Sequence, residues 1–273
     1  MSGRVDVLLA AAEQQLVALQ AAAVSHPWPL FVAFLIFHAV VFFGSQALWR
    51  RVTARRPQVE APVLASSTTA ATHGLVATLG AIWTLSQWDW QSFDEANTPA
   101  QTLLMLFSTA YFVEDTWYCA TLPADAFMYT MHHVVTAAFV ASPLLVSRGG
   151  IAICFGLFTG EVTNGLFHSY LILEQFAKVS PRAAAAFRWV AAVFTIVFVI
   201  VRSVMSWPAI FWYWRKAWAA VSVPYHHRIL WCTTALLVAL ASQGFAINFV
   251  TSTRKLWREH AEQQRQRQQR KAE

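Results

Sequence analysis

Long apolar runs separated by short polar segments dominate the pattern of this chain. Seven of the runs approach or exceed the roughly 20 residues that a helix needs to cross a bilayer. We predict membrane-spanning helices at 29–49, 67–87, 102–121, 127–146, 150–176, 187–214 and 227–250. Pro143 lies near the end of the fourth predicted span, and Pro208 is expected to kink the sixth.

The N-terminal region has a different pattern. Apolar residues recur at helical spacing, and Glu13, Gln14 and Gln15 interrupt the run, which is not typical of a cleaved signal. We therefore predict that residues 1–28 form an amphipathic helix, lying along the membrane surface or packed on the bundle. The remaining regions are then a first span with its loop (29–64), a membrane domain (65–250) and a basic tail (251–273).

The composition agrees with this pattern. Of the 273 residues, 57% are hydrophobic and only 12% are charged, a combination that soluble domains rarely show. The fold class predicted is an all-α polytopic membrane protein. Cys119, Cys154 and Cys232 fall inside apolar runs without a metal-type spacing, so we interpret them as packing residues.

The basic residues are distributed unevenly between the two sides of the predicted bundle. If the loop after the first span is cytosolic, that side carries 14 Lys and Arg residues and the other side carries 5. This bias predicts a cytosolic C-terminus and an N-terminus on the opposite side. The acidic segment WDWQSFDEAN (88–97) then also lies on the opposite side.

Several predicted spans contain polar residues that are costly in lipid and that usually face a bundle interior. They are Glu114 and Asp115 in the third span, His132 and His133 in the fourth, Glu161, Asn164 and His168 in the fifth, and Arg202 in the sixth. His38 and His73 stand alone in their spans, and we interpret them as helix-packing residues.

The predicted topology places most of these groups at a common depth. Glu114, Asp115, His132, His133 and His168 lie about 8–12 Å from the cytosolic ends of their helices. Glu161 and Arg202 lie deeper and are expected to form an ion pair. Helical spacing also puts Glu161, Asn164 and His168 on one stripe, and Tyr111 with Glu114 or Asp115 on another.

Two adjacent histidines in the segment MYTMHH (128–133) raise the question of chemistry. The chain lacks the repeated HxxHH boxes of di-iron lipid enzymes and a second histidine pair for haem, so we predict no metal and no cofactor. A histidine in such a layer can accept a proton from an amine or hydroxyl, or attack a thioester. A proton relay in a transporter is an alternative reading of the same residues.

The segments DAFMYTMHHVVTAA (125–138) and GGIAICFGLFTGEVTNGLFHSYLIL (149–173) resemble the TLC-domain family, which includes the ceramide synthases. The resemblance covers roughly residues 65–250. It implies a six-helix barrel around a lipid cavity, with one further helix, in the endoplasmic reticulum or another internal membrane. The histidine pair that ceramide synthases need corresponds to His132 and His133, and Asp125 sits where those enzymes carry an aspartate. Residues 160–164 (GEVTN) are closer to the smaller TLC-domain proteins, which are linked to membrane phospholipid composition.

The function predicted is therefore membrane lipid homeostasis, in the form of acyl transfer from acyl-coenzyme A to a lipid amine or hydroxyl. His132 is expected to act as base or nucleophile, and Glu114 or Asp115 to orient it. The predicted substrate-binding residues are Asp125, Glu161, Asn164, His168 and Arg202. A non-catalytic lipid-binding or regulatory protein, and a structural subunit of a membrane assembly, are the alternatives. Membrane lipids are the expected partners, and homo-oligomers or other membrane proteins stay open.

Overall fold

The computed structural model describes residues 2–121 and 126–272. These residues form helices and loops, with one isolated antiparallel bridge between Ala96 and Arg148. The α-helices are α1 (Ser2–Ser25), α2 (Pro27–Val52), α3 (Ala61–Ser86), α4 (Pro99–Ala120), α5 (Ala126–Val146), α6 (Gly150–Glu161), α7 (Asn164–Ala177), α8 (Pro181–Phe198), α9 (Ser206–Ala219) and α10 (Tyr225–Ala272). A short π-helix, Val199–Val204, joins α8 to α9.

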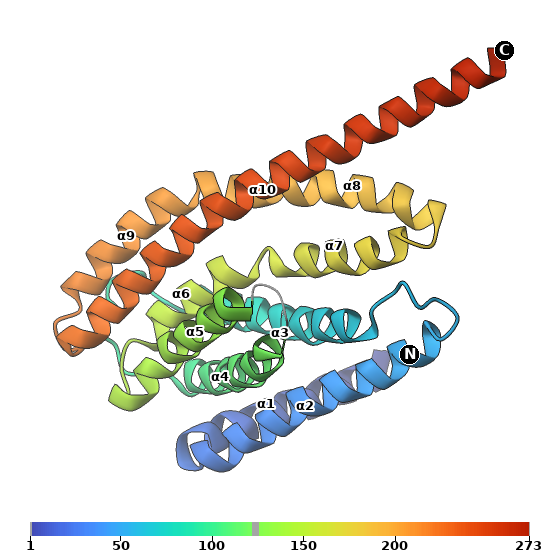
Figure 1. The fold of residues 1–273 in the computed structure, drawn as a ribbon. Helices are drawn as coiled ribbons and strands as arrows, with labels where there is room; N and C mark the ends of the chain where they lie inside the picture. The colour runs from blue at the N-terminus through green and yellow to red at the C-terminus, as the bar shows by residue number, and fades with distance from the viewer. Residues whose placement is uncertain (1, 122–125, 273) are drawn as a thin grey trace.

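The helices run back and forth between two ends of an elongated bundle (Figure 1). The α2–α3 and α7–α8 connections and the C-terminus lie toward one end, which we call the tail end. The α3–α4, α5–α6 and α9–α10 connections lie at the opposite end. Each predicted span coincides, to within one residue at its end, with part of a helix or of a pair of helices in nearly direct succession, so the predicted all-α polytopic class is confirmed.

Six helical stretches among the described residues are long and apolar enough to cross a membrane. They lie in α1, α2, α5, α6–α7, α8–α9 and α10. Predicted spans 67–87 and 102–121, which correspond to α3 and α4, are outside this set. Among the described helices these two bury the most residues, and the buried ones include Ser67, Thr69, Gln101 and Asp115. Because their neighbours are other helices rather than lipid, they tolerate polar residues that lower the mean hydropathy.

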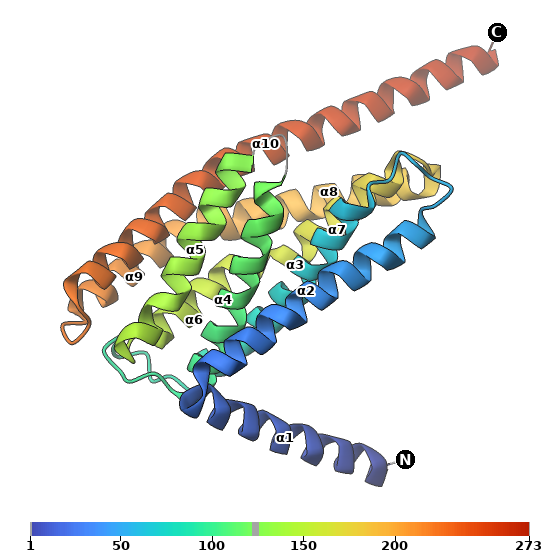
Figure 2. The same ribbon diagram turned by 60° about the horizontal axis from the view of Figure 1, so that its bottom comes forward.

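The N-terminal helix α1 is confirmed as a helix, although by length and hydropathy its residues Val5–Ser25 also qualify as a span. Its last turns pack against α2 and α4, and Ala23 is buried there. From that contact α1 diverges from α2 toward the N-terminus (Figure 2). The side chains from Val5 to Leu19 are exposed, so its apolar face is available to lipid or to another protein. The surface orientation of α1 stays a prediction.

Two predicted spans are interrupted at the places where they carry polar groups. Span 150–176 breaks at Val162 and Thr163, where most of residues 160–165 are weak helix formers. Span 187–214 changes to a π-helix that ends four residues before Pro208. Proline lacks an N–H and crowds the carbonyl of the residue four positions earlier, which accounts for the local change. The expected irregularity of the sixth span is therefore present as a π-helical turn.

The largest apolar core lies toward the end opposite the tail. It includes Trp88 and Phe93 of the α3–α4 connection and Trp231 of α10. Asn97 fastens this region, because its amide donates to the Pro143 carbonyl over 2.8 Å and its side-chain oxygen accepts from the Gly150 backbone N–H over 2.7 Å. The acidic connection is thus folded onto the bundle, and it holds the ends of α4, α5 and α6 in register.

Candidate polar site between α4 and α5

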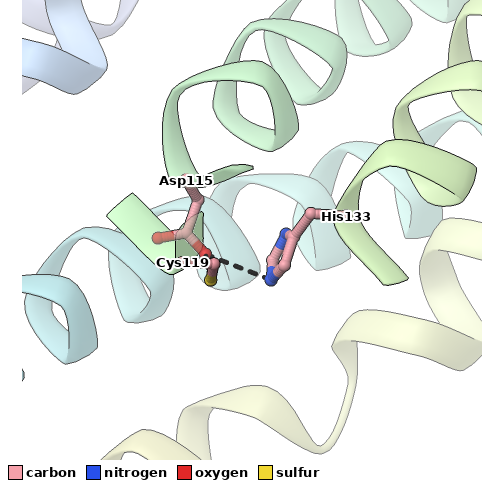
Figure 3. Close-up of side chains that lie close together, drawn as sticks. All are labelled: Asp115, Cys119 and His133. Atoms are coloured by element: carbon pink, nitrogen blue, oxygen red, sulfur yellow. Dashed lines mark hydrogen bonds and ion pairs between the residues drawn. The ribbon is translucent and has the colours of Figure 1, made fainter. Parts of the chain in front are cut away.

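Helices α4 and α5 lie side by side and bring a carboxylate and an imidazole together (Figures 2 and 3). Asp115 Oδ2 lies 3.2 Å from His133 Nε2. Both side chains are largely buried, with exposed fractions of 7% and 12%. The predicted convergence of the third and fourth spans is therefore present as a direct contact.

The same carboxylate oxygen has two further neighbours, both from α4. The Tyr111 hydroxyl donates to Asp115 Oδ2 over 3.4 Å, and the Cys119 thiol lies 3.8 Å from that oxygen. The three residues are spaced at i, i+4 and i+8, so they share one face of α4. One oxygen thus has a phenol, a thiol and an imidazole around it, an arrangement that fixes the carboxylate and, through it, the His133 ring.

His132 occupies a different position from His133. Its side chain is exposed, and its ring meets the His133 ring edge-on at a centroid distance of 5.3 Å. Adjacent helical positions point about 100° apart, so the two rings have different surroundings, as expected.

The predicted orientation of His132 by a carboxylate was wrong. Asp115 contacts His133, and no carboxylate of the described residues lies within 4.0 Å of a His132 nitrogen. Glu114 is buried, but its Oε2 has no hydrogen-bond partner among the described residues, because its place on α4 points it away from the Asp115 face.

A second polar cluster joins α3, α6 and α7. Asn164 donates its amide to Glu161 Oε2 over 2.7 Å, across the break between α6 and α7. His73 Nδ1 lies 3.6 Å from the same Glu161 oxygen, and the His73 side chain is fully buried. The predicted pairing of Glu161 and Asn164 on one stripe is therefore present despite the break. The His73 ring stacks on Tyr111, which places this cluster next to the Asp115 cluster.

Arg202 does not form the ion pair predicted for it. Among the described residues, no carboxylate lies within 4.0 Å of its guanidinium. Instead, Arg202 Nη1 donates to the Thr159 carbonyl over 2.9 Å, and Gln243 donates to the Arg202 carbonyl over 3.2 Å. The π-helical turn shifts the register of this segment, a displacement that helical spacing did not anticipate.

The remaining predicted site residues are less well connected. His168 is half-buried on α7, and within the part of the chain that the structure describes its Nδ1 has no hydrogen-bond partner. No carboxylate of the described residues approaches a His168 nitrogen within 4.0 Å, so the structure does not join it to Asp115. Asp125 lies outside the described residues.

Comparison with known proteins identifies the fold family. The family model described as the TLC domain matches residues 64–252, more than half of the chain. The chain belongs to the TLC-domain family. It is also 28% identical over 146 residues to a TLC domain-containing protein of Arabidopsis thaliana. That match covers 53% of this chain and 55% of the plant protein, so the chain spans about half the length of the curated relative.

The TLC domain contains both polar clusters. Helices α3–α9 lie entirely within residues 64–252 apart from the first turn of α3, whereas α1, α2 and the basic tail lie outside. Two residues of the TLC domain were missed as cluster members, His73 and Cys119. His73 could not be singled out from its own helix, because its partner Glu161 lies on another helix. Cys119 was detectable in one respect: it lies four positions after Asp115 and therefore shares its helical face.

Proposed function

We propose that this integral membrane protein acts in membrane lipid metabolism, by transferring an acyl chain from acyl-coenzyme A to a lipid amine or hydroxyl. The observation that carries the proposal is the oriented His133–Asp115 pair with the exposed His132 ring beside it. An exposed imidazole next to a rigidly held polar group is the arrangement that proton transfer or nucleophilic attack requires. Membership of the TLC-domain family supports a lipid-related role, and the acyl-transfer step is our own inference.

The reaction proposed is an exchange of one bond for another at the acyl carbon. The thioester C–S bond breaks, and a C–N amide or C–O ester bond forms. His132 either removes the proton from the lipid amine or hydroxyl, or first accepts the acyl group on a ring nitrogen. The proton finally leaves with the thiolate of coenzyme A, so no oxidant, reductant or further co-reactant is needed.

The surrounding residues have supporting roles in this proposal. Asp115 and Tyr111 hold His133, and His133 in turn limits the positions that His132 can adopt. Asn164, His168 and Arg202 would contact the lipid headgroup, and Glu161 would keep the Asn164 amide in place. A lipid cavity enclosed by a helical barrel, with its entrance for acyl-coenzyme A at the cytosolic face of the endoplasmic reticulum, completes the proposed arrangement.

The experiment uses the full chain in lipid nanodiscs. Consumption of acyl-coenzyme A is followed against sphingoid bases, lysophospholipids and diacylglycerol, for wild type and for His132→Ala. His226→Ala provides a matched control, because His226 is an exposed ring on α10 outside both clusters. We expect turnover with one class of acceptor, a fall of at least a hundredfold in His132→Ala, and wild-type activity in His226→Ala.

Two results would count against the proposal. If folded wild-type protein consumes no acyl-coenzyme A with any acceptor, acyl transfer is excluded and the non-catalytic lipid-binding alternative is favoured. If His132→Ala keeps its turnover, the protein is an enzyme but His132 is not its base or nucleophile.

A further inference from the structure

Three side chains with different metal-binding chemistry converge between α4 and α5 (Figure 3). Asp115 and Cys119 come from one face of α4, and His133 reaches them from α5. One potential ligand atom from each residue lies within 4.8 Å of the other two. Two helices held together along much of their length thus provide a carboxylate, a thiol and an imidazole at one point.

The separations are close to those that a small ion needs. Ligand atoms placed about 2.0–2.3 Å from a tetrahedral Zn²⁺ are about 3.3–3.6 Å apart. The His133 nitrogen and the Asp115 oxygen are 3.2 Å apart, and the Cys119 sulfur is 3.8 Å from that oxygen. These two separations are within a few tenths of an ångström of the tetrahedral values. The sulfur and the ring nitrogen lie within 4.8 Å of each other, and side-chain torsions can bring them to the separation that a tetrahedral ion needs.

The charge balance also favours an ion. Asp115 and Cys119 are both buried. No Lys or Arg of the described residues forms an ion pair with the Asp115 carboxylate. A carboxylate at membrane depth that no permanent cation neutralises is costly. A divalent cation bound by one carboxylate, one thiolate and one neutral imidazole gives a site of zero net charge, which removes that cost.

The ligand types narrow the choice of metal. A thiolate with an imidazole favours Zn²⁺ over Mg²⁺ and Ca²⁺, which prefer oxygen ligands. Three protein ligands leave a fourth position for water or substrate, as in catalytic zinc sites. The Tyr111 hydroxyl, which donates to Asp115, supplies an outer contact of the kind that orients a metal-binding carboxylate.

We propose that Asp115, Cys119 and His133 form a binding site for a Zn²⁺-like transition-metal ion. This site goes beyond acyl transfer and does not depend on it. It also replaces the expectation of no metal, which considered the spacing of histidines and the spacing of cysteines separately and assigned Cys119 to packing. The cysteine supplies the ligand that a search for histidine boxes misses.

Metal content tests the site directly. The full chain is purified in nanodiscs, equilibrated with Zn²⁺, freed of loose metal by passage over a chelating resin, and analysed by mass spectrometry of the elements. We expect one zinc per chain in wild type and at least a tenfold lower content in Cys119→Ser and in His133→Ala. Cys232→Ser, another buried cysteine, and His226→Ala should retain the metal.

A cobalt experiment separates ligand loss from misfolding. Co²⁺ bound to a thiolate has a near-ultraviolet charge-transfer absorption that carboxylate and imidazole ligands do not produce. We expect this band in wild type and in Cys232→Ser, and its absence in Cys119→Ser that is monodisperse and retains its helical circular dichroism. Folded wild type without zinc and without the cobalt band would overturn the proposal, as would Cys119→Ser with wild-type metal content. Neither measurement uses acyl-coenzyme A, so its outcome is independent of the acyl-transfer proposal.

Discussion

The ring of His73 lies flat against the ring of Tyr111, with centroids 3.9 Å apart and planes inclined by 10°. His73 also faces Glu161, and the Tyr111 hydroxyl donates to Asp115. The stacked pair therefore bridges two carboxylates that lie on different helices. Through it, α3, α4 and α6 contribute to a single buried polar group of residues, and α5 joins through His133.

Tyr111 should contribute to stability mainly through its ring. Tyr111→Phe retains the stack on His73 and loses only the hydroxyl, so we expect a loss of about 1 kcal/mol in the free energy of unfolding. Tyr111→Ala also removes the ring and should cost about 3–5 kcal/mol. Reversible unfolding in mixed micelles measures both. Equal losses in the two variants would mean that the stack contributes nothing.

The Glu161–Asn164 contact should be sensitive to charge. Asn164→Ala removes the amide donor from a buried carboxylate and should cost about 1–3 kcal/mol. Asn164→Asp should cost more, since it places a second carboxylate at the same point. The double variant Glu161→Gln, Asn164→Asp exchanges the two groups and should recover most of the stability. A double variant no more stable than Asn164→Asp would show that the loss has another origin.

Gly149 should not tolerate a side chain. Its φ of 83° lies in the left-handed region, and a Cβ there would overlap the Trp231 ring. Gly149→Ala is therefore expected to destabilise the protein by about 2–4 kcal/mol. Gly44→Ala is the matched control, because Gly44 lies within α2 with no neighbour close to the position of an added Cβ. Since alanine favours helix, Gly44→Ala should be neutral or stabilising by up to about 1 kcal/mol.

The predicted orientation can be tested by labelling introduced cysteines. Gln58 lies in the α2–α3 connection and Gln91 in the α3–α4 connection, and both are exposed. The natural cysteines are all buried, so they should give little background. In sealed microsomes, a membrane-impermeant maleimide should label Gln58→Cys from the cytosolic side, and Gln91→Cys only after permeabilisation. The reverse pattern would invert the topology predicted from the basic residues.

The helices themselves followed from the apolar runs, because a span must satisfy its backbone internally and must present apolar side chains to lipid. The interruptions inside the fifth and sixth spans could not be predicted from these runs. Glu161 and Asn164 were correctly placed on one stripe, but the break between them depends on weak helix formers inside an apolar run. Arg202 was assigned to Glu161 on depth alone, and the π-helical turn displaced it.

The candidate site shows a similar limit. Periodicity within one helix placed Tyr111 on a stripe with either Glu114 or Asp115, and the depth estimate brought His133 to the same layer. Helix periodicity does not state how two helices are rotated against each other, and that rotation decides whether Asp115 meets His132 or His133. The same missing information made His73 look like an isolated packing residue.

Helix α10 has 48 residues and is unbroken. At 1.5 Å per residue its length is about 72 Å, more than twice the thickness of a hydrocarbon core. The part after Val250 extends for about 33 Å along the helix axis, roughly four screening lengths at physiological salt. The charges at its tip, including Arg270 and Lys271, are then shielded from the lipid headgroups wherever the axis stands upright. The tail would then act as a stiff lever arm that carries positive charge away from the bilayer, toward whatever approaches from the aqueous side.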